Sequence, residues 1–144
     1  MILFCLASWQ ACKPGGDKGE LVLRLKEVVL RENPARPPSE LPGVFFYQGA
    51  KILKTGIYRT ERRIAAPEGV VVFSTPDDPA TVTGYFTRVV RKREWKIIQS
   101  LRNPEEHLLM VESSGRRYKR LITIILRGRG PTTIKIYFRR SEID

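Results

Sequence analysis

The chain has 144 residues, of which 42% are hydrophobic and 28% charged, which fits one folded domain with a modest core and excludes wholesale disorder. Its 26 lysines and arginines against 15 acidic residues give a formal net charge of +11, so the protein favours anionic partners such as nucleic acid, phospholipid headgroups or other polyanions. Both cysteines lie within the first 12 residues, which excludes a disulfide framework or a cysteine-based zinc site in the rest of the chain.

The excess of positive charge is local. Residues 1–42 hold six basic and five acidic side chains, whereas residues 43–144 hold twenty and ten. The basic character therefore belongs to the domain that we expect to fold, and the chain before it is nearly neutral.

Residues 1–12, MILFCLASWQAC, form an apolar run without a charge, too short to span a bilayer as a helix. Two interpretations fit this run: a buried first element of the fold, or the end of a signal peptide that begins upstream of Met1. Residues 13–19, KPGGDKG, combine a proline, three glycines and three charges and are typical of a flexible tether. They favour the signal peptide, because a tether of this kind does not continue a packed element.

An apolar run that ends in Ala11-Cys12 and is followed by a polar tether resembles the leader of bacterial lipoproteins. The resemblance implies that Cys12 is lipidated and becomes the N-terminus of the mature protein. It also implies a location in the cell envelope, on the periplasmic side and anchored to the membrane. Gln10 and Trp9 depart from the small and aliphatic residues that this family prefers before the cysteine.

Residues 20–32, ELVLRLKEVVLRE, are compatible with a helix or a strand. Leu21, Leu25, Val28 and Val29 follow a helical stripe, whereas Leu21, Leu23 and Leu25 alternate as in a strand. The richness in Leu, Glu, Lys and Arg favours the helix. Four prolines follow between residues 33 and 42, so we predict a helix and a proline-rich linker over residues 20–40.

The clearest helical pattern is TPDDPATVTGYFTRVVRKREW, residues 75–95. Asp78 before Pro79 provides an N-cap and a proline at the first helical position. Gly84 within the helix indicates close packing. One apolar face follows the helical spacing and consists of Val82, Tyr85, Phe86, Val89 and Val90.

Strand patterns surround this helix, at residues 69–75, 94–100 and 106–113 and in a hairpin over residues 117–140 whose turn contains Gly128, Gly130 and Pro131. A helix followed by successive antiparallel strands predicts an α+β fold over residues 41–144. We expect an antiparallel sheet of about four to six strands with one main amphipathic helix packed on one face.

One face of the predicted hairpin is basic. Lys135, Tyr137 and Arg139 alternate with apolar residues on the last strand, Lys119 and Arg127 join them from the neighbouring strand, and Arg129 lies in the turn. These six residues are the candidate anion-binding site, in which Tyr137 would stack on a base if the partner is nucleic acid. The alternative is a solvated face that only keeps the sheet soluble.

Catalytic patterns are weak. Glu105, Glu106 and His107 are adjacent, but a single histidine among charges at a strand start is usually exposed. Asp77 and Asp78 are better explained by helix capping, and RGRGPTT at residues 127–133 by a hairpin turn than by a phosphate-binding loop. We therefore predict a protein that is not an enzyme and has no cofactor and no metal site.

Three segments, LPGVFFYQGAKIL, STPDDPATVTGYF and REWKIIQ, resemble a group of small uncharacterised bacterial envelope lipoproteins with an α+β domain. The resemblance covers residues 41–140 and implies an envelope-tethered module without a known reaction; Glu94 stands where the family has glycine. The matching positions are Pro42, Tyr47, Gly49, Ala50, Thr75, Asp77, Asp78, Tyr85 and Trp95.

The predicted function is that of a non-catalytic, exported envelope protein whose basic surface binds anionic lipid or another polyanion. Lipid anchoring through Cys12 belongs to the same prediction. The alternative is a cytoplasmic nucleic-acid-binding domain that uses the same basic sheet face and holds residues 1–12 in its core.

Overall fold

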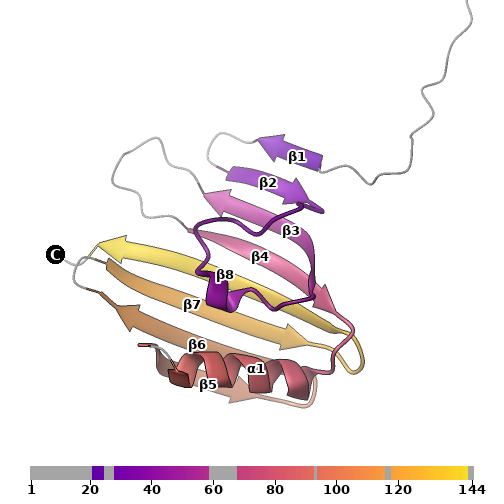
Figure 1. Ribbon diagram of the computed structural model, residues 1–144, viewed down its shortest axis with the longest axis vertical. Helices are drawn as coiled ribbons and strands as arrows, with labels where there is room; N and C mark the ends of the chain where they lie inside the picture. Colours follow the sequence, from indigo (N-terminus) through magenta and orange to yellow (C-terminus); the bar gives the residue numbers. More distant parts are fainter. Residues whose placement is uncertain (1–20, 25–27, 59–67, 93, 116–117, 143–144) are drawn as a thin grey trace, which may run out of the picture.

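The computed structural model describes residues 21–24, 28–58, 68–92, 94–115 and 118–142. In these residues a single antiparallel sheet is built in the order β1-β2-β3-β4-β8-β7-β6-β5 (Figure 1). The elements are β1 (Leu21–Arg24), β2 (Val28–Glu32), the short 3-10 helix η1 (Gly43–Phe45), β3 (Lys51–Tyr58), β4 (Glu68–Thr75), the helix α1 (Pro79–Lys92), β5 (Lys96–Arg102), β6 (Glu106–Ser114), β7 (Tyr118–Arg127) and β8 (Thr132–Glu142).

The expected α+β fold with four to six strands is wrong: the protein is mostly β, with eight strands in one sheet and a single α-helix in the described residues. Part of the difference lies in residues 20–32, where the predicted helix is replaced by β1 and β2. Antiparallel pairing explains this change, because β2 lies beside β3 with Val29 opposite Ile57 and Arg31 opposite Thr55. Pairing with a partner far along the chain overrides a modest local preference for helix.

The sheet also continues across residue 41, where we expected the domain to begin, because β2 precedes this point and β3 follows it. Residues 1–20 lie outside the described residues, so the leader, the tether and the lipidation of Cys12 stay predictions. Within the described ranges, no helix is long and apolar enough to cross a membrane.

The helix predicted after Asp78 is confirmed as α1. Asp78 caps it, since its Oδ1 accepts from the Thr81 backbone N–H at 3.0 Å and its Oδ2 from the Thr81 hydroxyl at 2.7 Å. Both contacts favour the ionised carboxylate and lower the Asp78 pKa, the hydroxyl contact contributing most. The close packing expected at Gly84 is absent, because a Cβ built there would meet no atom within 4 Å.

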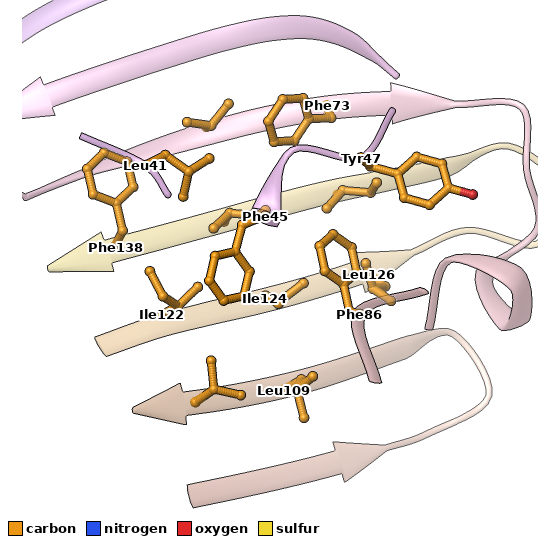
Figure 2. Close-up of a cluster of buried hydrophobic side chains, with 14 of the residues drawn as sticks. Leu41, Phe45, Tyr47, Phe73, Phe86, Leu109, Ile122, Ile124, Leu126 and Phe138 are labelled. Carbon is orange, nitrogen blue, oxygen red and sulfur yellow. The ribbon is translucent and has the colours of Figure 1, made fainter. Parts of the chain in front are cut away.

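Helix α1 and residues 41–50 lie over the same face of the sheet, which we call the inner face; the opposite face is the outer face (Figure 1). In Figure 2, Phe86 from α1 and Phe45 from η1 lie over the inner face with Ile122, Ile124 and Leu126 of β7. The Phe45 side chain is fully buried and meets the ring of Trp95 edge-on, with the centroids 4.8 Å apart. Burial of such side chains stabilises the fold by about 1.5–3 kcal/mol each.

Residues 41–50 form hydrogen bonds with α1 and with the segment before it. The Tyr47 hydroxyl donates to Asp77 Oδ2 at 2.5 Å, and the Tyr85 hydroxyl lies 3.1 Å from the carbonyl oxygen of Val44. The bond to Asp77, followed by burial, raises the pKa of Tyr47 to about 12. Asp77 thus has a second role beyond the helix N-terminus: its carboxylate holds the segment that closes the core.

Candidate functional site

The predicted basic face is centred on β8. Ile134, Ile136 and Phe138 of this strand are buried on the inner face. Because side chains alternate along a strand, Lys135, Tyr137 and Arg139 lie on the outer face. Tyr137 is 46% exposed, Arg139 is exposed and Lys135 is half-buried. These three predicted site residues therefore share one face of one strand.

Apolar side chains of β7 lie opposite these cations, a feature that was not expected from the sequence. In the β7–β8 pair, Leu121 is opposite Arg139 and Ile125 is opposite Lys135. Directly opposed residues of paired strands share a face and lie within contact distance. The outer face is therefore amphipathic rather than simply basic.

The apolar character extends across the sheet. Residues paired from strand to strand form a row on the outer face, and several members of this face expose large side chains. The row consists of Leu23, Leu30, Gly56, Val70, Tyr137, Thr123 and Met110. The exposed large side chains of this face include Leu23, Leu30, Tyr58, Leu101 and Tyr137. Exposed apolar side chains gathered on one face of a sheet are typical of a contact surface.

Three of the predicted cations form ion pairs with glutamates. Lys119 Nζ lies 3.0 Å from Glu112 Oε2, and Arg127 pairs with Glu106. Arg129 in the β7–β8 turn pairs with Glu105. By contrast, Lys135 and Arg139 form no ion pair in the part of the chain that the structure describes, although Glu68 of β4 is directly opposite Arg139 on this face. The six predicted residues thus split into three paired cations, near the two ends of β7 and in the turn that follows it, and a group on β8 made by Lys135, Tyr137 and Arg139.

The glutamates of β6 are the site residues that sequence reasoning missed. Glu106 and Glu112 lie on the outer face because they are paired with Arg127 and Leu121 of β7. The alternation of Glu106, Leu108, Met110 and Glu112 was a usable signal, because it gives this strand one acidic and apolar face. It was missed because the neighbour of β6 was not known.

The β7–β8 turn closes as a hairpin rather than as a phosphate-binding loop. Gly128 has φ +150°, and a Cβ there would lie 2.2 Å from the Pro131 carbonyl oxygen, so only glycine fits. A cavity of about 600 Å³ lies beside the turn. Its two arginines, Arg127 and Arg129, each face a glutamate, which leaves little positive charge for an anion.

His107 is half-buried rather than exposed as expected. Its Nδ1 lies 3.2 Å from the Thr83 hydroxyl and its Nε2 lies 3.1 Å from the Ser100 hydroxyl. Burial, and then the charge of Arg102, lowers the His107 pKa and favours the neutral ring. One ring nitrogen then donates and the other accepts, so both hydroxyls are partners of a neutral imidazole that links α1, β5 and β6.

This arrangement does not assemble the chemistry of a catalytic or metal site. The neighbouring Glu105 and Glu106 carboxylates are paired with arginines, and neither bonds the imidazole. In the described ranges, no three His, Cys, Asp or Glu side chains are grouped so that they could hold a metal ion. The hydroxyl of Ser100 lacks the carboxylate-oriented histidine that activates a serine nucleophile.

Comparison of the chain with known families finds no matching family model, and comparison with curated proteins and with solved structures finds no match either. The outer face is therefore the feature of the molecule that points to a function.

Proposed function

We propose that this protein is a non-catalytic envelope protein whose outer sheet face binds an anionic lipid surface. One observation carries the proposal: the cations Lys135 and Arg139, without ion pairs in the described residues, lie on the same face as exposed apolar and aromatic side chains. Apolar groups that enter the headgroup boundary and cations that meet anionic headgroups are the two contributions that hold a protein at a membrane surface.

A nucleic-acid partner is less well supported by this face. Nucleic-acid affinity depends on many cations that meet phosphates, and three of the predicted cations here are paired with glutamates. Glu106 and Glu112 would also face the phosphate backbone. An apolar row with a single aromatic at its centre suits a lipid boundary better than a row of stacked bases.

Export and anchoring rest on the sequence pattern around Cys12. One acyl chain gives only marginal membrane binding, and a second signal makes it stable. The outer face would supply this second signal. The lipid on Cys12 and the sheet face would then act together to hold the protein at the membrane.

The test measures co-sedimentation of the full chain, carrying Cys12→Ser, with phosphatidylcholine vesicles that contain or lack phosphatidylglycerol. Each cation near an anionic surface contributes about 1 kcal/mol. Lys135→Gln together with Arg139→Gln should therefore lower the partition onto anionic vesicles by about 30-fold. The matched control replaces Arg88 and Arg91, which are exposed on α1, and should change binding little.

Two results would contradict the proposal. The first is an equal loss in the α1 control, which would show a generic charge effect. The second is sequence-selective binding to duplex DNA, tighter than about 10⁻⁸ M at physiological salt, which would favour the nucleic-acid alternative.

A further inference from the structure

A second group of arginines lies on the opposite face of the sheet. Arg120 of β7 and Arg140 of β8 are directly opposite each other in the strand register. They lie on the inner face, since Ile122 and Phe138, two positions away on each strand, are buried there. This pair stands where β7 begins and β8 ends, beside the segment that leads into Leu41.

The two like charges of this pair favour an anion beside them, although Arg120 is exposed and Arg140 is half-buried. Like charges directly opposite each other in a sheet repel. Arg140 is held in place by Tyr118, whose ring centroid lies 4.5 Å from the guanidinium carbon. The Arg140 Nε is buried and has no hydrogen-bond partner among the described residues. A buried donor without an acceptor among the described residues indicates a place that an additional acceptor would satisfy.

A pocket of about 400 Å³ opens at this point, within the usual range for a small-molecule site. Arg120, Arg139 and Arg140 line it together with one carboxylate, that of Glu40. Glu40 accepts a hydrogen bond from Ser39 at 3.3 Å and forms no ion pair with these arginines. The pocket therefore carries a net positive charge, and Ile122 and Phe138 give it an apolar wall.

We infer that this pocket binds a phosphate monoester, with the guanidinium groups of Arg120 and Arg140 on its oxygens. The planar fork of an arginine matches two phosphate oxygens at once. A phosphate monoester carries close to two negative charges at neutral pH, which offsets both members of the pair. The apolar wall suits the organic part of the ligand. The inference does not depend on the proposed function, because Arg120 and Arg140 lie on the inner face, although Arg139 of the outer face also lines the pocket.

Calorimetric titration of the full chain with glycerol 3-phosphate, at constant ionic strength, tests this inference. Arg120→Gln and Arg140→Gln should each weaken binding at least about tenfold. Arg91→Gln on α1 is the charge-matched control and should bind as the wild type does. Arg120→Lys keeps the charge but loses the fork, so it should also weaken binding while leaving the fold intact.

Thermal unfolding in chloride buffer gives an independent readout. Because the pair repels when no anion is present, Arg120→Gln should leave the midpoint unchanged or raise it. A clear fall of the midpoint in both glutamine variants would mean that the arginines are structural, and it would overturn the inference. Unchanged binding in both variants would also overturn it.

Vesicles that contain phosphatidic acid separate the two sources of a phosphate monoester. Binding of glycerol 3-phosphate with the stated arginine dependence identifies a soluble ligand. Binding only to the vesicles, lost in Arg120→Gln and retained in Lys135→Gln, identifies a lipid headgroup. If neither probe binds at concentrations up to about 10 mM, the pocket is not a phosphate site.

Discussion

Adding one methyl group at Gly69 tests the packing between β3, β4 and β8. Gly69 is opposite Ile57 of β3 and Phe138 of β8. A Cβ there would lie 2.6 Å from the Gly56 carbonyl oxygen, 2.7 Å from Phe138 Cζ and 2.9 Å from Ile57 Cδ1. The two side chains can turn aside, but the carbonyl oxygen moves only if β3 shifts. Gly69→Ala should therefore destabilise the protein by about 1–3 kcal/mol, the usual cost of overpacking.

Gly84→Ala is the matched control, because the same methyl group enters open space on α1. Alanine in a helix is favoured over glycine, so this variant should gain about 0.5–1 kcal/mol. Urea unfolding monitored by circular dichroism measures both changes from the midpoints, provided that the two variants share the wild-type slope. A neutral Gly69→Ala would refute the contact of β3 with β4, and a destabilising Gly84→Ala would refute the placement of that side of α1 in open space.

Two further predictions concern the core and its closing segment. Phe86 is 1% exposed, so Phe86→Ala should lower the unfolding free energy by about 3–5 kcal/mol; a loss below about 0.5 kcal/mol would contradict the helix-on-sheet packing. The pKa of Tyr47 is raised to about 12, so its contribution is present below pH 10 and is lost as the pH rises toward 12. The Tyr47 side chain is buried, but its partner Asp77 is exposed. The stability advantage of wild type over Tyr47→Phe should therefore shrink by about 1 kcal/mol between pH 9 and 11; a constant difference in urea titrations would contradict this.

Local patterns were sufficient where one segment carries its own signal. Helix α1 followed from its apolar spacing and from Asp78 before Pro79, and both are features of adjacent residues. The β7–β8 hairpin followed from two alternating runs around Gly128. In these places the periodicity of the side chains and the chemistry of the turn agree, so the sequence alone indicated the element.

Residues 20–32 show why the remainder of the sheet could not be predicted. Their leucines satisfy both a helix and a strand, and the choice depends on β3, which follows only after the proline-rich segment. The edge strand β5 was expected, but its place at the far end of an eight-stranded order was not. Strand order is determined by contacts between distant residues, which no local pattern contains.

The candidate site shows the same limit in its electrostatics. The formal net charge of +11 is the excess of basic over acidic residues in the whole chain. Binding of an anion depends instead on which individual cations are not paired with a neighbouring acid. Strand pairing neutralises Arg127 with Glu106 on the outer face. It also places Arg120 directly opposite Arg140 on the inner face, where neither arginine forms an ion pair with another described residue. The count therefore overstated the positive charge near the ends of β7 on the outer face and gave no sign of the inner pocket. In a sheet, the register decides where net charge is available for a ligand.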